Sequence, residues 1–224
     1  MITISGLSKS YGSVLILNNI SYTFNTGKIY GIIGKNGAGK TTLFNCMTGL
    51  ESYTGSITFK NNTKKNLGYL ATEPFFFPKL TGREYIRLLV QARNIKNFTI
   101  EDNNIFELPL DRYVDQYSTG MKKKLALTAI LGQGNSCYIL DEPFNGVDLQ
   151  SNMIIEELLF KLKSLNKTIL ISSHILSTLT NFCDELLLLE NGIFSKKVTP
   201  ENFVQFEADI KMETIKKNLD RMKL

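Results

Sequence analysis

Several features that would place a protein in a membrane or outside the cell are missing from this sequence of 224 residues. A membrane-spanning helix needs roughly 20 consecutive apolar residues, and the best apolar run here, Leu186–Leu189, lies between Glu185 and Glu190. Residues 1–5 show no basic stretch followed by an apolar one, so we expect no secretory signal peptide. There is also no internal repeat and no low-complexity linker. These absences favour a globular protein that stays in the cytosol.

Cysteine is scarce, and the excess of positive charge is small. The three cysteines, Cys46, Cys137 and Cys183, occur in apolar surroundings without metal-ligand spacing, so we expect buried, reduced thiols. The net charge is +5, and no basic stripe interleaved with aromatic residues is present. A solvated, lysine-rich surface accounts for this charge, although an anionic membrane surface stays open as a partner. We expect no nucleic-acid partner.

The hydrophobic pattern alternates between strands and helices and predicts an α/β fold with a mostly parallel sheet, whose ligands bind at the carboxyl ends of its strands. The expected strands cover residues 2–4, 14–17, 20–24, 29–33, 56–59, 137–140, 168–171 and 185–189. Helices are expected over residues 149–165 and 175–182, and Thr81 with Glu84 forms a capping box that opens another. The polar stretch 94–111, broken by Pro109, has no clear assignment.

The most informative segment is Gly34-Lys35-Asn36-Gly37-Ala38-Gly39-Lys40-Thr41-Thr42. It follows the apolar run Ile29–Ile33 and leads into apolar residues at helical spacing, which is the strand, turn and helix that a phosphate-binding loop requires. Glycines let backbone N–H groups curl around phosphate oxygens, and the new helix directs its positive end at them. Lys40 is then expected to reach the terminal phosphates, and the Thr41 hydroxyl to hold Mg²⁺.

Two carboxylates follow a second apolar strand. Asp141 and Glu142 come directly after Cys137–Leu140, at the sheet edge where a nucleotide held by the loop at 34–42 would lie. Asp141 can hold Mg²⁺, directly or through water, and Glu142 can polarise the water that attacks the γ-phosphate. Strands often end in acidic turns, so this pair becomes informative only because the phosphate loop precedes it.

Three further segments complete the pattern. Tyr117-Ser118-Thr119-Gly120-Met121-Lys122 precedes the Asp-Glu strand, Asn145-Gly146-Val147-Asp148 follows it, and His174, the only histidine, follows the apolar run Ile169–Ser173. In order and spacing, over essentially the whole chain, these segments and the two nucleotide motifs resemble the ATP-binding subunits of ABC transporters. A GTPase would need Asn-Lys-x-Asp, and Asn166-Lys167-Thr168-Ile169 lacks the aspartate.

The resemblance implies a second anion site at the family's signature, which is usually Leu-Ser-Gly-Gly-Gln. Here Ser118, Thr119, Gly120 and Met121 are expected to contact the ATP bound by the opposite subunit. Ser118 also stands where an N-cap would, so its hydroxyl, nearby N–H groups and the helix dipole could all face a phosphate. The alternative is an ordinary capped amphipathic helix with Lys122–Lys124 in solvent.

Other roles are implied by the resemblance alone. Asp148 belongs to the family's D-loop. His174 is expected to contact the γ-phosphate and the attacking water, although a lone histidine is often structural. Tyr11 occupies the place of the aromatic that stacks on adenine, because an aromatic face covers a base at low entropy cost. A tyrosine before a turn is also common without any ligand.

The chain departs from the family at Thr72, where a glutamine or sometimes a glutamate is usual six residues before the proline that is here Pro78. The threonine hydroxyl could still reach Mg²⁺ or its water, or Glu73 could take the role. The neighbouring Phe75–Phe77 lies where the family receives a short helix of the membrane subunit. These aromatic residues could form a docking surface or could pack into the core.

We therefore expect residues 1–224 to form a single ABC ATPase domain, with a phosphate-loop core, an N-terminal antiparallel β subdomain, a short helical subdomain at about 72–135 and a helical tail at about 201–224. Its expected activity is ATP hydrolysis with ATP and Mg²⁺, in a homodimer or heterodimer that closes around two ATP molecules. It would drive a separate membrane permease from the inner face of the cell membrane, and its signature is more like those of exporters. A non-transport ABC ATPase and a hydrolytically weak heterodimer partner remain as alternatives.

Overall fold

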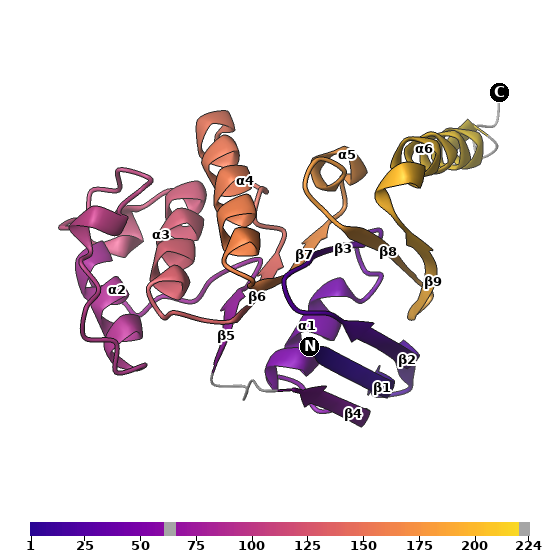
Figure 1. Cartoon of the computed structure of the whole chain (residues 1–224), viewed down its shortest axis with the longest axis horizontal. Coiled ribbons are helices and arrows are strands. Elements are labelled where there is room, and N and C mark those ends of the chain that lie inside the picture. Colours follow the sequence, from indigo (N-terminus) through magenta and orange to yellow (C-terminus); the bar gives the residue numbers. More distant parts are fainter. Residues whose placement is uncertain (61–65, 220–224) are drawn as a thin grey trace.

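The structure is a computed structural model that describes residues 1–60 and 66–219, with the side chains of the last helix described as far as Met212. It contains two sheets (Figure 1). The larger has six strands in the order β5-β6-β7-β3-β8-β9, and the first five of these run parallel. The strands are β3 (Ile29–Ile33), β5 (Leu67–Leu70), β6 (Cys137–Asp141), β7 (Thr168–Ser173), β8 (Glu185–Glu190) and β9 (Ile193–Val198).

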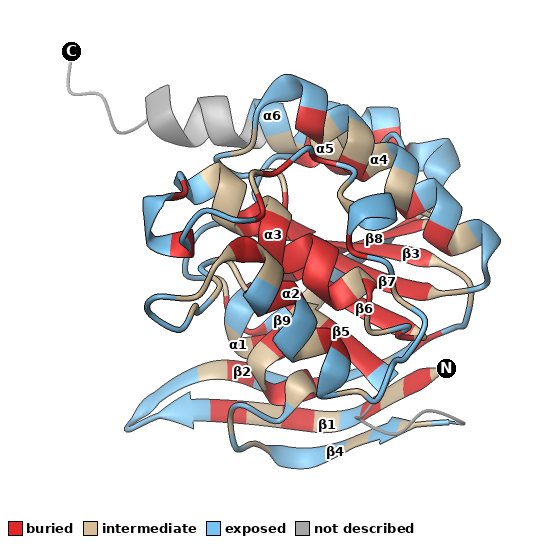
Figure 2. Ribbon diagram, turned by 90° about the vertical axis from the view of Figure 1, so that its left-hand side faces the viewer, coloured by how far each residue is buried: buried red, intermediate tan, exposed pale blue. Residues whose placement is uncertain are grey.

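The central strands are buried on both faces, as Figure 2 shows, which explains why they read as continuous apolar runs. Successive residues contribute to two different cores because side chains alternate across a sheet. In β3, Ile29 and Ile33 belong to the core beneath the larger helices, whereas Tyr30 and Ile32 belong to the core around α1 (Lys40–Thr48). The strand is therefore fixed in register from both sides.

A smaller antiparallel sheet covers α1 on its other side, in the order β2-β1-β4. Its strands are β1 (Ile2–Tyr11), β2 (Val14–Phe24) and β4 (Thr54–Phe59). The two strands expected at 14–17 and 20–24 form the single strand β2, which continues through Asn19 in the left-handed region at φ 51°. The predicted α/β fold with an N-terminal antiparallel β sheet is confirmed.

The remaining helices lie on the other face of the large sheet (Figures 1 and 2). Two of them, α2 and α3, occupy one end of the molecule beside β5 and β6 (Figure 1). The helices are α2 (Gly82–Gln91), α3 (Thr119–Leu131), α4 (Leu149–Ser164), α5 (Leu176–Leu179) and α6 (Phe203–Leu219), with short 3₁₀ turns η2 (Glu101–Asn103), η3 (Val114–Gln116) and η4 (Pro200–Asn202). Residues 220–224 of the expected tail lie outside the described residues.

Three differences from the sequence-based expectation concern short elements. Strands β5 and β9 were not expected, and the helix expected over 175–182 is limited to Leu176–Leu179. The capping box at Thr81 is present, since Thr81 Oγ1 accepts from the Glu84 N–H and the Glu84 carboxylate accepts from the Thr81 N–H. The stretch 94–111 holds η2 and turns.

The three cysteines are buried free thiols, as expected. Burial raises the pKa of Cys46 to about 11 and that of Cys137 to about 12, so both are protonated at neutral pH. Within the described residues, no helix combines the length and the hydropathy needed to cross a bilayer.

Candidate active site

A cavity of about 490 Å³ opens at the carboxyl ends of β3, β6 and β7. Open parallel sheets bind ligands at this edge. The cavity is lined by Ile16, residues 35–42, Thr72, Glu142, Asn145 and His174. Segments that are more than 100 residues apart in the sequence thus share one wall, because β6, β3 and β7 are neighbours in the sheet.

The loop between β3 and α1 has the geometry of an anion cradle. Gly37 and Gly39 have φ values of 81° and 103°, and a Cβ on Gly39 would lie 2.9 Å from a methyl carbon of Leu17. Glycine is therefore required at position 39 both by the backbone and by the space. Helix α1 has no side-chain N-cap and no acidic residue in its first turn, which leaves its first N–H groups and positive end available to an anion.

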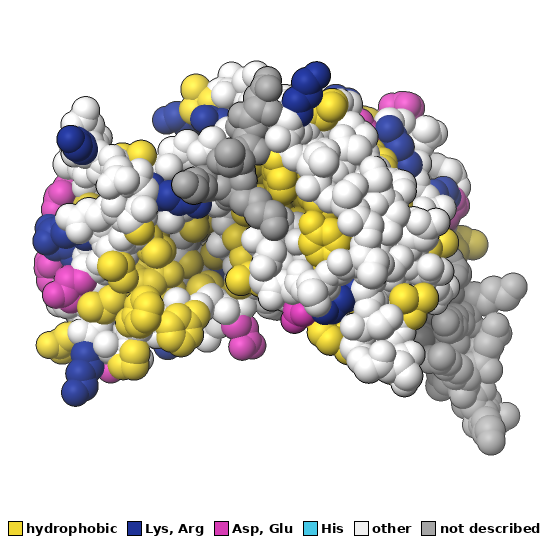
Figure 3. All heavy atoms as spheres, turned by 90° about the horizontal axis from the view of Figure 1, so that it is seen from below, with side chains coloured by type: hydrophobic (Ala, Val, Ile, Leu, Met, Phe, Trp, Pro, Cys, Tyr) yellow, Lys and Arg dark blue, Asp and Glu magenta, His cyan; other side chains and the backbone are white. Residues whose placement is uncertain are grey.

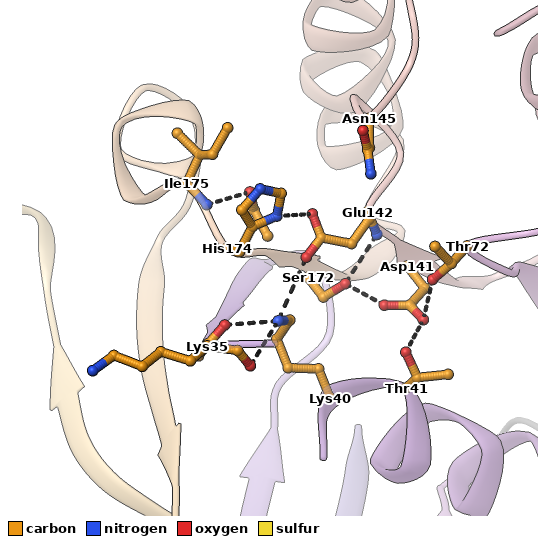
Figure 4. A network of polar contacts seen from close by, with 12 residues as sticks. Lys35, Lys40, Thr41, Thr72, Asp141, Glu142, Asn145, Ser172, His174 and Ile175 are labelled. Atoms are coloured by element: carbon orange, nitrogen blue, oxygen red, sulfur yellow. Dashed lines mark hydrogen bonds and ion pairs between the residues drawn. The ribbon is translucent and has the colours of Figure 1, made fainter. Parts of the chain in front are cut away.

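Lys40 lies inside this loop and is 6% exposed. Its Nζ donates to the carbonyl oxygens of Gly34 and Lys35 at 2.7 and 3.4 Å, and it lies 3.5 Å from Glu142 Oε1 (Figure 4). Lys35 behaves differently, since Figure 4 shows its side chain extending away from the cluster. Among the described residues, the ammonium of Lys40 is thus the charge held in the centre of the loop.

Asp141 is fully buried at the end of β6 and is surrounded by hydroxyl groups. Thr41 Oγ1 and Thr72 Oγ1 donate to the same carboxylate oxygen, Oδ2, at 2.6 and 2.7 Å, and Ser172 Oγ donates to Oδ1 (Figure 4). A carboxylate flanked by hydroxyl oxygens is a set of hard ligands that suits Mg²⁺, which keeps several waters and shares phosphate oxygens. Within the described residues no group of three or more His, Cys, Asp or Glu could hold a metal ion, so a metal here would depend on this mixed set.

Glu142 occupies a strained turn beside Asp141. Its φ is 50°, in the left-handed region that residues other than glycine rarely adopt. Its N–H donates to Ser172 Oγ at 2.9 Å, and its Oε2 lies 2.9 Å from His174 Nδ1 (Figure 4). The Glu142 side chain is 11% exposed and that of His174 40% exposed, so the pair lies at the mouth of the cavity. A carboxylate held there can orient a water molecule.

The signature residues lie apart from this cavity. Ser118 is the N-cap of α3, and its Oγ accepts from the Met121 N–H at 3.2 Å. Ser118 and Thr119 are exposed, and Gly120 and Met121 are half-buried. None of these four residues lines the cavity that holds Lys40. The expected N-cap is present, and the exposed N-terminus of α3 is free to meet another molecule.

Asp148 and Tyr11 also stand outside the cavity. Asp148 caps α4 by accepting from the Ser151 N–H at 2.8 Å, and with Lys124 at 3.0 Å this holds the pKa of Asp148 well below its usual range. Tyr11 is 45% exposed at the end of β1, with Lys9 Nζ 4.8 Å from its ring centre. A second cavity of about 710 Å³ borders the phosphate loop near the β8–β9 turn, and Tyr11 lines neither cavity.

Two polar residues of the site were not found from the sequence. Ser172 is buried in β7 opposite Asp141 in the sheet register and donates to Asp141. Lys123 of α3 is 3% exposed, and its Nζ donates to the carbonyl oxygens of Glu142 and Asn145 at 2.8 and 2.9 Å. Burial lowers the pKa of Lys123. The negative charges of Glu142, Asp141 and Glu73 act in the other direction and raise it, but burial has the larger effect. A serine at the end of an apolar strand was the only signal for Ser172. Lys123 was considered only under the alternative of an ordinary amphipathic helix, which placed it in solvent.

Comparison with known proteins identifies the family. The model of the ABC transporter family matches residues 17–145. The lantibiotic transport ATP-binding protein SrtF of Streptococcus pyogenes is 35% identical in an alignment of 201 residues that covers 86% of this chain and 88% of that protein. The bacitracin transport ATP-binding protein BcrA of Enterococcus faecalis is 32% identical in an alignment of 212 residues that covers 88% of this chain and 69% of that protein. The chain belongs to the ATP-binding subunits of ABC transporters, and its reaction is ATP hydrolysis coupled to transport.

Solved structures agree with this. An ATP-binding subunit of an ABC transporter superposes with a TM-score of 0.83 at 26% identity, over 92% of this chain and 93% of the other. A dimeric ATP-binding cassette bound to ADP and Pi superposes with a TM-score of 0.80, over 89% of this chain and 99% of the other, but at 19% identity it supports the fold alone. The resemblance seen in the sequence and the predicted ATPase activity are confirmed.

Proposed function

We propose that this chain is the ATP-hydrolysing subunit of an exporter, with its catalytic centre at the cavity between the phosphate loop and Glu142. The observation that carries the proposal is the convergence of Lys40, Glu142 and His174 on one cavity, with Asp141 buried behind Thr41 and Thr72 of its wall. Asp141 ends β6, Glu142 and His174 directly follow β6 and β7, and Lys40 begins α1 after the neighbouring strand β3. Phosphoryl transfer requires just such charged groups around the γ-phosphate and the attacking water.

The contacts suggest how each group acts. The Lys40 ammonium donates a hydrogen bond to the Gly34 carbonyl oxygen and lies near the Glu142 carboxylate. When ATP binds, its β- and γ-phosphate oxygens would replace these partners around the ammonium. Thr41, Thr72 and Asp141 would hold Mg²⁺, which supplies charge neutralisation at the phosphates when it is bound. Glu142 would then be released to orient water, with His174 directed at the γ-phosphate.

The signature segment requires a second ATPase subunit. Ser118 to Met121 do not line the cavity of their own chain, yet the N-terminus of α3 is exposed and positively polarised. In a head-to-tail dimer this N-terminus would cover the γ-phosphate of the ATP held by the partner. Two ATP molecules would then be shared between two chains, and the lack of any acidic residue in the first turn of α3 supports this anion-binding role.

Export is supported by the relatives. SrtF and BcrA are named for transport of a lantibiotic and of bacitracin, and a further relative in Rhizobium leguminosarum, 32% identical, is a Nod factor export ATP-binding protein. We infer that this chain powers efflux of such antibiotics from the inner face of the membrane, through a separate permease. The exposed rings of Phe75 and Phe77 are the proposed contact with that permease.

The test uses two variants with opposite effects on nucleotide binding. Lys40→Ala should lose ATP affinity by at least about 100-fold, since the ammonium held inside the phosphate loop is lost. Glu142→Gln should keep ATP affinity and lower kcat by at least about 100-fold, because only water activation is lost. Titration with a fluorescent ATP analogue and phosphate release measure the two effects. In cells that lack the natural gene, either variant should leave growth as sensitive to bacitracin or a lantibiotic as the deletion does.

Each part of the proposal can fail separately. A Glu142→Gln protein that hydrolyses ATP at the wild-type rate would contradict the assignment of the water-orienting group. Normal ATP affinity in Lys40→Ala would move the nucleotide to another site. If both variants behave as expected but deletion of the gene changes no antibiotic sensitivity, the ATPase assignment stands and export of these antibiotics is wrong.

A further inference from the structure

Lys123 is a buried charge that the hydrolysis reaction described above does not use. It lies in the second turn of α3, is 3% exposed, and forms no ion pair with a carboxylate among the side chains described, those of residues 1–60 and 66–212. Burying a charge is costly unless hydrogen bonds compensate for the lost water. The compensation comes from the main chain of one turn, the carbonyl oxygens of Glu142 and Asn145 at 2.8 and 2.9 Å.

That turn carries the proposed water-orienting carboxylate. Glu142 is left-handed at φ 50°, and its carbonyl oxygen accepts from the Asn145 N–H at 3.2 Å as well as from Lys123. A residue in such a conformation stays there only when its surroundings hold it. Lys123 joins the first and last residues of the turn, so the ammonium fixes the backbone from which the Glu142 side chain reaches His174.

Lys123 also lies on the helix whose N-terminus is the proposed trans ATP site. Ser118, the N-cap of α3, stands five residues, or about 1.4 helical turns, before Lys123. A Cβ on Gly120 would lie only 2.5 Å from the Gly146 carbonyl oxygen, so the signature segment and the residues after Glu142 are packed backbone against backbone. A movement of the N-terminus of α3 would therefore also move the turn that carries Glu142.

We propose that Lys123 is a positioning residue that transmits the seating of the partner's ATP on the signature segment to the Glu142 carboxylate of its own subunit. The inference rests on the proposed function, because it requires the signature to bind ATP in trans and Glu142 to orient water. When α3 is drawn toward the partner's γ-phosphate, Lys123 pulls on both ends of the turn and sets the direction of the carboxylate. An ATP bound at one site of the dimer thereby prepares hydrolysis at the other.

The experiment replaces the ammonium with an apolar group of similar length. In Lys123→Met, kcat should fall by at least about 10-fold, the scale of a lost hydrogen bond to a charged group, while KM for ATP and ADP affinity change less than about 2-fold. Lys123→Arg, which can donate to both carbonyl oxygens, should recover most of kcat. Lys163→Met is the matched control, since it removes an ammonium whose ion pair with Asp184, 2.6 Å long, lies outside the cavity.

A spectroscopic measurement separates positioning from stability. His174 is the only histidine and contacts Glu142, so its imidazole resonances report the direction of that carboxylate. They should shift in nucleotide-free Lys123→Met and stay unchanged in Lys163→Met. If Lys123→Met does not fold, Lys123→Gln, which keeps a donor without the charge, is judged by the same two readouts and should show an intermediate kcat.

The result that overturns the proposal is a wild-type kcat with unshifted imidazole resonances. A loss of ATP affinity and thermal stability in proportion to kcat would also overturn it, because it would indicate a structural role only. Failure of the proposed function would give a different pattern of activities in the two variants. If Glu142→Gln is inactive and Lys123→Met is normal, only the positioning role is wrong, whereas an active Glu142→Gln protein removes the basis of both.

Discussion

At the scale of single residues, the arrangement around Asp141 explains how the chain tolerates threonine where its family usually has glutamine. The Thr72 hydroxyl donates to Asp141 Oδ2, the oxygen that also accepts from Thr41. Glu73, the alternative candidate, is exposed and does not line the cavity. The shorter side chain thus keeps a polar atom beside the candidate metal ligands. Its coupling role, which in a glutamine depends on reach, stays a prediction.

His174 offers the most selective test of the reaction centre at this scale. Its Nδ1 lies 2.9 Å from Glu142, and the residue lines the same cavity as the phosphate loop. His174→Ala should lower the hydrolysis rate by about 100-fold or more, which is typical for loss of one positioned polar group in phosphoryl transfer. ADP affinity should change little, because ADP lacks the phosphate in question. Phosphate release and nucleotide titration measure both quantities.

The wild-type imidazole provides the control for that variant. Its resonances, unambiguous with one histidine, should shift when Mg²⁺ and a non-hydrolysable ATP analogue are added and much less with ADP. Resonances that respond to neither nucleotide would make His174 a structural residue, whatever the variant's rate.

At the scale of elements, the predictable parts of the fold are those with a continuous apolar signal. Strands β3, β6, β7 and β8 were predicted close to their observed bounds because each is buried on both faces. Strand β9 is an edge strand with the exposed charged residues Lys196 and Lys197, a composition that disfavours further pairing and hides the strand from a hydrophobic pattern. Strand β5 is only four residues long. The helix after His174 ends at Leu179 because Phe182 and Cys183 turn into the core before β8.

The residues of the site also divide into those with a local sequence signal and those without one. Lys40, Asp141 and Glu142 belong to contiguous motifs, and their types and spacing predicted that they lie together. In the structure Lys40 and Glu142 line one cavity, and Asp141 is buried behind Thr41. Ser172 and Lys123 contribute through the register of β7 with β6 and through the packing of α3 on a turn. Such contacts depend on which strands become neighbours, and no local pattern in the sequence carries that information.

The capping box of α2 makes a prediction that concerns one element alone. Thr81→Ala removes the acceptor for the Glu84 N–H and should lower the free energy of unfolding by about 1 kcal/mol, since helix N-caps contribute about that much. For a chain of this size, that corresponds to a fall in Tm of about 2–4 °C. Thermal unfolding checks it, with Thr81→Ser as the control that keeps the hydroxyl. Because α2 lies at the far end from the cavity, a loss of ATP affinity in Thr81→Ala would contradict the local role.

At the scale of the whole molecule, the three phenylalanines after Thr72 divide between core and surface. Phe76 packs against Tyr85 of α2, with ring centres 4.6 Å apart, so part of the segment is core as the alternative reading held. Phe75 and Phe77 are 72% and 52% exposed and stack edge to face at 5.3 Å. Figure 3 shows hydrophobic side chains gathered on one face at the same end of the molecule as α2. Exposed apolar clusters of this kind mark interaction sites.

This surface connects the segment after Thr72, and through it the nucleotide cavity, with the proposed permease. The double variant Phe75→Ser, Phe77→Ser should keep basal ATPase activity within about 2-fold, since neither ring lines the cavity or the core. It should lose most of the stimulation of hydrolysis by the co-purified permease in proteoliposomes. The two rings, exposed in the free subunit, would be buried in the complex and would supply much of the binding energy. Val204→Ser, at another side chain that is 84% exposed, is the matched control and should keep the stimulation. Equal stimulation in the double variant and the control would place the permease on a different face, while the ATPase site would be unaffected.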